Sequence, residues 1–431
     1  MSKSVKIITL GCSKNTVDSE KLARQLDNSG YSIDLTSRES NADIVIVNTC
    51  GFINDAKEES INTILELIEA RERGDIGKLY VMGCLSERYR DQLKHDIPEV
   101  DQYFGVNRPE EILDYLKSGY KNSLDPERLL SGPDHYAYLK VSEGCNRNCA
   151  FCAIPGIRGR YQSRPVKDII EEAAFLVNRG VKEIILIAQD LSYYGKDLHR
   201  KPSLASLCES ILQETEVKWL RLHYLYPGGV SNELLELIRL ESRICNYIDI
   251  PIQHISDRVL SSMKRNHTGQ DTRKQLQYIR DNIPGAAVRT TLITGYPGET
   301  DDDFMNLLDY VRDYRFDRLG VFTYSHEEDT YAHRNLSDDI PSKIKKERAD
   351  IIMAAQQEIS LERNRNLVGS IMRIIIDREE QDLYIGRTEH DSPEIDQEVL
   401  LSKKNNILER GEFYDVVITG ASEFDLEAKL L

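Results

Sequence analysis

Three cysteines lie close together at Cys145, Cys149 and Cys152, with the spacing C-x3-C-x2-C, directly after a short apolar run that ends in Gly144. Three thiolates can hold one face of a metal centre. An iron-sulfur cube bound by protein alone takes four cysteine ligands, so this motif predicts a 4Fe-4S cluster with one open iron. Zinc is the alternative, but zinc sites pair such a motif with a second set of Cys or His. The next cysteine is Cys208, so we expect iron-sulfur.

A second set of three cysteines, Cys12, Cys50 and Cys84, is spread over the first quarter of the chain. Each follows a strand-like run and has a glycine beside it. The ends of parallel strands gather at one edge of a sheet, where α/β proteins place their ligands. Glycine lets the backbone approach a bulky centre closely. We therefore predict a second three-thiolate cluster, although three buried core cysteines would be the simpler interpretation.

The segment that carries the second set, residues 1–120, alternates strand and helix patterns. This alternation predicts a doubly wound parallel sheet. The strand-like runs are 5–10, 31–36, 43–47 and 78–82, and helical periodicity covers 18–27 and 54–73.

A polar stretch rich in glycine and proline, Lys117 to Pro133, indicates a linker, which we place at 121–134. In residues 135–365, six strand-like runs each precede a helical segment, which predicts a partial parallel (β/α)6 barrel. Active sites of such barrels lie at the carboxyl ends of the strands. The C-x3-C-x2-C motif follows the first strand, and polar residues follow the others. The runs are 136–141, 183–188, 219–225, 247–252, 287–293 and 319–324.

Beyond a charged helix at about 342–366, residues 366–431 have strand character without helices, at 370–376, 383–386, 398–401 and 413–419. A small antiparallel β-barrel fits this pattern. This last segment has 7 Lys and Arg against 15 Asp and Glu, which is half of the net charge of −16 of the 431-residue chain. An acidic surface repels nucleic acid and attracts a basic protein, so we expect no stable nucleic-acid binding.

The bulk composition is that of a water-soluble protein, with 40% hydrophobic and 30% charged residues. No apolar run reaches the roughly 20 residues that cross a membrane, so we expect a cytoplasmic protein with no membrane partner. In a reducing compartment, eight cysteines favour metal ligands or core positions over disulfides. Cys208 and Cys245 have the surroundings of core residues.

The motif at Cys145, Cys149 and Cys152, with Phe151 before the last cysteine, resembles the radical S-adenosylmethionine (SAM) enzymes. The whole layout resembles the methylthiotransferases within them, which end in a TRAM barrel. The resemblance includes the runs 154–165 and 294–300. It implies that SAM binds the open iron of the first cluster and yields a radical that abstracts hydrogen. It also implies that the second cluster supplies sulfur and that an electron donor, whose identity the sequence does not give, reduces the protein.

Three local features resemble the ribosomal-protein branch of the methylthiotransferases rather than the tRNA branch. These are Tyr161, where tRNA enzymes typically carry Glu, the run Gly386–Asp396 with Pro393-Glu-Ile-Asp396, and the acidic last barrel. This resemblance implies methylthiolation of the β-carbon of an aspartate in small-subunit ribosomal protein twelve, a basic partner. Two alternatives stay open: a tRNA adenosine methylthiotransferase, and a non-catalytic assembly factor whose thiols bind zinc.

Several polar residues near the expected cavity are candidates for further roles. Phe151, Gln189 and Glu299 are candidates for contact with SAM, the last two because they follow barrel strands. Arginines after the motif could hold a carboxylate through paired hydrogen bonds or could belong to a solvated loop. Three histidines at strand ends could transfer protons or be ordinary rim residues. The arginines are Arg158, Arg160 and Arg164, and the histidines are His223, His254 and His326.

Overall fold

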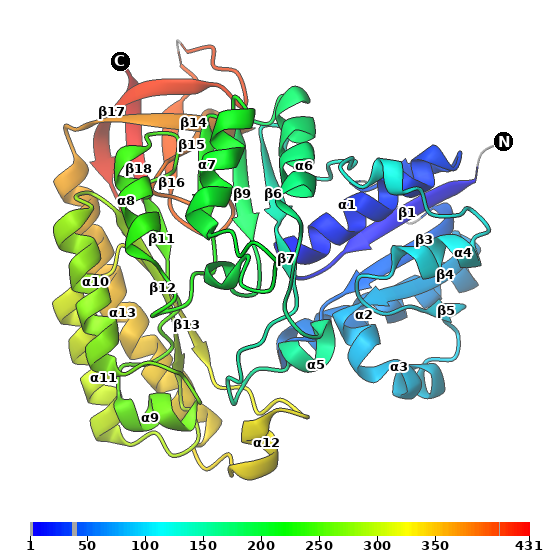
Figure 1. Cartoon of the computed structure of the whole chain (residues 1–431), viewed down its shortest axis with the longest axis horizontal. Coiled ribbons are helices and arrows are strands. Elements are labelled where there is room, and N and C mark those ends of the chain that lie inside the picture. Colours follow the sequence, from blue (N-terminus) through cyan, green and yellow to red (C-terminus); the bar gives the residue numbers. More distant parts are fainter. Residues whose placement is uncertain (1–2, 37–40, 405) are drawn as a thin grey trace.

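The computed structural model describes residues 3–36, 41–404 and 406–431 as three packed units (Figure 1). The amino-terminal unit is a parallel five-stranded sheet of order β2-β1-β3-β4-β5, flanked by helices, which confirms the expected doubly wound sheet. Its elements are β1 (Ser4–Thr9), α1 (Ser13–Asn28), β2 (Ser32–Asp34), β3 (Ala42–Thr49), α2 (Asn54–Glu72), β4 (Ile76–Gly83), α3 (Cys84–Asp96), β5 (Gln102–Tyr103) and α4 (Pro109–Tyr115).

The central unit is the expected partial barrel. Its six strands form two three-stranded parallel sheets, β10-β9-β6 and β11-β12-β13, which a bridge between Leu220 and Ile244 connects. The strands are β6 (Tyr136–Lys140), β9 (Glu183–Ile187), β10 (Trp219–Leu222), β11 (Tyr247–Asp249), β12 (Ala287–Thr294) and β13 (Arg318–Thr323). The small strands β7 (Ser142–Glu143) and β8 (Gln162–Ser163) pair beside the first of them.

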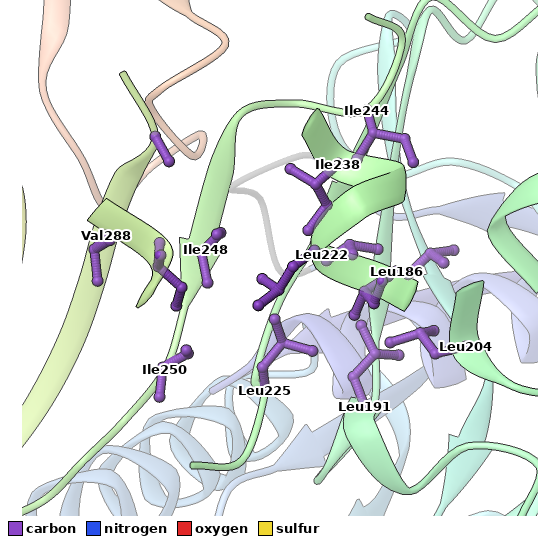
Figure 2. Close-up of a cluster of buried hydrophobic side chains, with 14 of the residues drawn as sticks. Leu186, Leu191, Leu204, Leu222, Leu225, Ile238, Ile244, Ile248, Ile250 and Val288 are labelled. Atoms are coloured by element: carbon purple, nitrogen blue, oxygen red, sulfur yellow. The ribbon is translucent and has the colours of Figure 1, made fainter. Parts of the chain in front are cut away.

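Helices cover the outside of this barrel (Figure 1). They are α6 (Val166–Asn178), α7 (Leu204–Glu214), α8 (Asn232–Leu240), α10 (Gly269–Asn282), α11 (Asp301–Tyr314) and the long α13 (Ser342–Leu367). Three short helices lie at the mouth of the barrel: α5 (Ile154–Arg158), α9 (Asp257–Ser262) and α12 (Tyr331–Asn335). The 3-10 turns are Asn122–Leu124, before the barrel, and Leu191–Tyr193. Branched side chains such as Leu186, Leu222 and Ile248 fill the space between strands and helices (Figure 2). Burial of each contributes roughly 1.5–3 kcal/mol. Cys208 is fully buried in this core and Cys245 in a neighbouring cluster, as predicted.

The carboxy-terminal unit is a closed five-stranded barrel of order β14-β15-β16-β18-β17. The sequence indicated antiparallel pairing throughout, but β16 and β18 pair in parallel. The parallel pair involves the last strand, β18, which was not predicted from the sequence. This strand lies between β16 and β17 and closes the barrel. The strands are β14 (Ile371–Glu380), β15 (Leu383–Thr388), β16 (Glu398–Ser402), β17 (Phe413–Ala421) and β18 (Asp425–Leu430). Within the described residues, no helix combines the length and apolarity needed to cross a membrane.

The connection between the first two units is packed rather than loose. Leu124 is buried, and Arg128 is fully enclosed between the ion-pair partners Glu20 of α1 and Glu172 of α6, each 3.1 Å away. Glu172 also pairs with Lys21 at 3.0 Å and with Arg164 at 2.7 Å. One buried carboxylate therefore joins the amino-terminal sheet, the linker and the barrel.

This carboxylate makes the stability of the docked units depend on pH. Burial opposes the ionisation of Glu172, but the positive charges of Arg164, Lys21 and Arg128 have the larger effect. They lower the pKa of Glu172 to about 2, from an ordinary value of 4.5. Because the pKa is lower in the folded than in the unfolded protein, ionised Glu172 stabilises the fold at pH values above 4.5. This stabilisation is lost as the pH falls from about 4.5 toward 2. Its size is roughly 3 kcal/mol at neutral pH. We expect wild type to exceed Glu172→Gln in unfolding midpoint at pH 7, with the gap narrowing below pH 4.5. A constant gap in pH-dependent unfolding curves would contradict this assignment.

Candidate functional site

The loop with Cys145, Cys149 and Cys152 folds back at the carboxyl end of β6. Gly144 has φ +71°, and a β-carbon there would lie 2.2 Å from the carbonyl oxygen of Arg160. The backbone N–H of Cys145 donates to the carbonyl oxygen of Gly159 at 3.1 Å. Glycine is thus required where the incoming and outgoing arms of the loop touch, and this contact holds the three thiols at the barrel mouth.

A cavity of about 1120 Å³ opens beside this loop. Cys149 and Cys152 line it, together with the segments that follow β11 and β13. Glu87 and Arg88 of α3 complete the wall, so the amino-terminal unit closes one side of the cavity. Arg88 is held there by an ion pair to Glu327 at 2.9 Å. A space of this size at the strand ends is large enough for a cofactor beside the thiols.

Two arginines surround the thiols of this loop. Arg265 Nη1 lies 3.6 Å from Cys149 Sγ, and the backbone N–H of Arg147 donates to Cys145 Sγ at 3.4 Å. The two guanidinium groups stack on the ring of Tyr226, 3.7 and 4.2 Å from its centroid. Their positive charge favours thiolates. Burial acts the other way and raises the pKa of Cys145 to about 11 and that of Cys152 to about 12. A bound metal would hold these thiols as thiolates at neutral pH.

The second set of cysteines meets at the carboxyl edge of the amino-terminal sheet. Cys12 is the residue before α1, Cys50 follows β3, and Cys84 is the first residue of α3. Positions at the starts of helices favour negative sulfur. Burial raises the pKa of Cys84 to about 11, and it also raises that of Cys50.

Asn15 connects the loops of this second set. Its Nδ2 donates to the carbonyl oxygens of Leu10 at 2.8 Å and Thr49 at 3.2 Å. Its Oδ1 accepts from Cys84 Sγ at 3.9 Å. The predicted meeting of the three cysteine segments at one sheet edge is therefore present, and one amide side chain joins them.

The donor chemistry of both sets fits an iron-sulfur cube. Among the described residues, no three Cys, His, Asp or Glu side chains form a group that fits a single metal ion. Each set offers three thiols, and the two remaining cysteines lie in hydrophobic cores. Three thiol donors without a fourth suit a 4Fe-4S cluster with one open iron.

Gly11 gives a test of the second set that does not remove a thiol. Its φ is +88°, and a β-carbon would lie 2.7 Å from the β-carbon of Cys50. We expect Gly11→Ala to displace Cys50 and to lose about half of the roughly eight irons of a two-cluster protein. Iron analysis of anaerobically reconstituted protein measures this loss. Gly30→Ala is the matched control, because Gly30 also has positive φ but no atom within 4 Å of its added β-carbon. Equal iron in both variants would contradict the expected role of Gly11.

The two cysteine sets are neighbours. Ala153, which follows Cys152, packs with Ile157 of α5 against Cys84 and Val106 of the amino-terminal unit. In Figure 1, α5 lies between the barrel and the amino-terminal sheet. The short segment after the first motif thus contacts both sets, an arrangement that the sequence did not indicate.

The three candidates for SAM contact lie in different surroundings. Phe151 packs against the apolar cluster with Tyr296 and Tyr324. Gln189 Nε2 donates to Glu143 Oε1 at 3.2 Å. Glu299 is buried, and its carboxylate accepts from the backbone N–H of Gly295 at 2.9 Å and from Arg348 at 2.7 Å. None of the three is among the residues that line the 1120 Å³ cavity. Their contact with SAM stays a prediction.

The arginines and histidines singled out in the sequence have separate partners. Arg164 pairs with Glu172, Arg160 is exposed, and Arg158 is buried beside the second cysteine set. His223 lies 2.9 Å from Ser392 Oγ, His254 lies 3.7 Å from Glu299, and His326 lies 2.9 Å from the hydroxyl of Tyr324. Sequence reasoning did not identify Arg147, Arg265 or Asn15. Asn15 stands three residues after Cys12, but no spacing signal connects Arg265 with Cys149.

Much of the run Gly386–Asp396 is buried against the barrel, although Glu394 and Ile395 are exposed. Asp391 accepts from Arg318 Nε at 2.9 Å, and Asp396 accepts from the hydroxyl of Tyr247 at 2.7 Å. Glu394 accepts from the hydroxyl of Tyr136 at 3.1 Å. Carboxylates that we expected to attract a basic partner are therefore partly used inside the protein, where they hold the last barrel on β6, β11 and β13.

Comparison with known families gives a match for each unit. Residues 139–311 match the radical SAM superfamily, residues 4–105 match the uncharacterized protein family UPF0004, and residues 368–431 match the TRAM domain. Among solved structures, similarity extends to TsrM, a radical SAM methyltransferase from Kitasatospora setae with cobalamin and a [4Fe-4S] cluster bound. The TM-score is 0.54 with 14% identity over 75% of each chain, which supports the fold.

Curated relatives match over nearly the whole chain. The sequence is 50% identical over 429 residues to the ribosomal protein uS12 methylthiotransferase RimO of Bacteroides thetaiotaomicron, covering 100% of this chain and 98% of that protein. It is 49% identical over 422 residues to the protein of the same name from Christiangramia forsetii, covering 98% of this chain and 93% of that protein. The protein of this name from Porphyromonas gingivalis is 50% identical over 428 residues, covering 99% of each chain.

Proposed function

Because the chain belongs to the ribosomal protein uS12 methylthiotransferase (RimO) family, we propose that it adds a methylthio group to the β-carbon of an aspartate in uS12. It is a radical SAM enzyme. The main support for this proposal is the sequence identity of about 50% to RimO proteins along the entire chain. The match therefore includes all three units in the same order. These relatives favour neither the tRNA alternative nor a zinc-binding assembly factor.

The cofactors of this enzyme are 4Fe-4S clusters and SAM. We assign Cys145, Cys149 and Cys152 to the cluster that binds SAM, and Cys12, Cys50 and Cys84 to an auxiliary cluster. The clusters and SAM supply one-electron chemistry and sulfur, which protein side chains cannot supply. We assign residues 1–120, 135–365 and 366–431 to the auxiliary-cluster, radical SAM and TRAM units, with a linker at 121–134.

The side chains around these thiols have defined tasks in this proposal. Arg147 and Arg265, stacked on Tyr226, offset the negative charge of the SAM-binding cluster. Arg88 and Glu87 wall the cavity from the amino-terminal side and limit the entry of water. Asn15 holds the auxiliary thiols at the sheet edge next to α5. Phe151, Gln189 and Glu299 are proposed to orient SAM, Glu299 through the turn that it braces.

The partners follow from the same proposal. The substrate is a basic ribosomal protein, and the chain has a net charge of −16, which favours such a partner over nucleic acid. An external one-electron donor must reduce the clusters, because no other redox group is proposed for this chain. We place the reaction in the cytoplasm, where ribosomal proteins are made.

The test uses the full-length enzyme, reconstituted anaerobically with iron and sulfide. Purified uS12 and total tRNA are incubated separately with enzyme, SAM and a chemical reductant, and both are analysed by mass spectrometry. We expect one aspartate of uS12 to gain a methylthio group in place of hydrogen, with tRNA unchanged. Modified tRNA together with unmodified uS12 would reverse the assignment. Omission of SAM is the control.

A further inference from the structure

Arg158 is a buried cation that extends from the first cysteine loop to the second cysteine set. It is the last residue of α5, six positions after Cys152, and its side chain is almost inaccessible. Its Nη2 donates to Asn15 Oδ1 at 2.6 Å. Its Nη1 donates to Glu143 Oε1 at 3.0 Å and to Asp18 Oδ2 at 3.2 Å. The guanidinium therefore joins a barrel loop to α1 of the amino-terminal unit.

The contact with Asn15 brings this charge to the auxiliary thiols. The same Asn15 Oδ1 accepts from Cys84 Sγ at 3.9 Å, and Ile157, the neighbour of Arg158, packs on Cys84. Arg158 is thus within electrostatic range of the auxiliary set.

Ion pairs account for part of the role of Arg158. Asp18 and Glu143 carry two negative charges, and Lys140 and Arg158 together balance them. Lys14 lies near Cys12 and stacks on the ring of Tyr224, 3.8 Å from its centroid. Beyond these pairs, Arg158 donates to Asn15, which contacts Cys84, so its charge also faces the auxiliary thiols.

We propose that Arg158 is a positioning residue for the auxiliary cluster: it raises the reduction potential of that cluster and fixes it against the loop of the SAM-binding cluster. This inference rests on the assignment of Cys12, Cys50 and Cys84 as cluster ligands. A nearby positive charge stabilises the reduced, more negative form of a cluster, and net charge and hydrogen bonds near the sulfurs set iron-sulfur potentials. At the first cysteine loop, Arg265 lies directly against Cys149, so a buried or half-buried arginine accompanies each cysteine set.

The experiment isolates each cluster in the full-length chain. In a Cys145→Ala, Cys149→Ala, Cys152→Ala background, only the auxiliary cluster contributes to an electron paramagnetic resonance redox titration. We expect Arg158→Gln to lower the ratio of reduced to oxidised cluster about tenfold at the background's midpoint, a shift of 59 mV for one electron. Arg158→Lys keeps the charge and should stay near the background value. Arg265→Gln should leave this cluster unchanged and lower the potential of the other cluster in a Cys12→Ala, Cys50→Ala, Cys84→Ala background.

Each outcome decides the inference. An iron-loaded Arg158→Gln protein with unchanged potential would overturn it, as would equal shifts in the Gln and Lys variants. If the Arg158→Gln protein does not bind the cluster, the Arg158→Lys protein is the test. Iron bound by the Lys variant at a potential near the background value supports the role of the charge. Loss of iron from the Lys variant overturns the inference. A background protein that binds no iron while Arg158 is native would instead contradict the proposed ligands, and this result is distinguishable because it appears before Arg158 is changed.

Discussion

Replacement of Cys12, Cys50 and Cys84 by alanine is expected to stop methylthiolation while reductive cleavage of SAM continues. The proposed SAM-binding cluster keeps its three thiols in this variant, so radical generation is retained and only the sulfur source is lost. The reciprocal variant, Cys145→Ala with Cys149→Ala and Cys152→Ala, should lose both activities completely. Each variant should retain about four of the roughly eight irons.

Three measurements check this separation: iron content, formation of 5′-deoxyadenosine, and mass spectrometry of uS12. The matched control is Cys208→Ala with Cys245→Ala, because both thiols are fully buried among apolar side chains. This control should keep all of the iron and both activities. Methylthiolated uS12 from the variant without Cys12, Cys50 and Cys84 would rule out the auxiliary site as the sulfur source, and iron loss in the control would move a ligand to Cys208 or Cys245.

Glu183→Gln is expected to destabilise the chain by about 3–5 kcal/mol, the usual effect of removing one partner from a buried ion pair. Glu183 starts β9 and has no exposed surface. It accepts from Arg221 Nε at 2.7 Å and pairs with Arg387 of the last barrel. Burial opposes its ionisation, but the two guanidinium groups hold the pKa of Glu183 below its ordinary value. The substitution leaves two buried positive charges with reduced compensation between the barrel and the TRAM unit.

Chemical unfolding of the reconstituted enzyme measures this effect. Glu398→Gln is the control in the same TRAM barrel: the side chains of Glu398 and its partner Arg378 are 32% and 43% exposed, so the expected change is below about 1 kcal/mol. Arg387→Met in the Glu183→Gln background removes one of the two buried positive charges and should recover part of the lost stability. Equal unfolding midpoints for Glu183→Gln and Glu398→Gln would show that the buried network does not secure the TRAM unit.

Much of this architecture could be predicted because local patterns carry it. The six barrel strands and the doubly wound sheet were expected within a few residues of their bounds, since strand–helix alternation is a local signal. The helix α3 and the strand β18 were not predicted. Charged residues are frequent in α3, which weakens its apolar periodicity. The strand β18 forms by pairing with β16 and β17 when the barrel closes, and this pairing is not visible in its local sequence.

The sequence by itself predicted the two cysteine sets, the order of the three units and the ribosomal-protein branch of the family, while two alternative functions stayed open. Thiol spacing, glycine positions and strand order are written along the chain, so residues 145–152 and the ends of β1, β3 and β4 could be assigned without coordinates.

Only the tertiary structure decided how the polar residues between these features are used. Arg158 could have been a solvated arginine, yet it meets Asn15, 143 positions away. The acidic run ending at Asp396 suggested a surface for a basic partner, yet Asp391 and Asp396 bind Arg318 and Tyr247 inside the molecule. The physical reason is that a charge takes whichever partner the packed fold brings within a few ångströms, and contacts between distant segments leave no spacing signal in the chain.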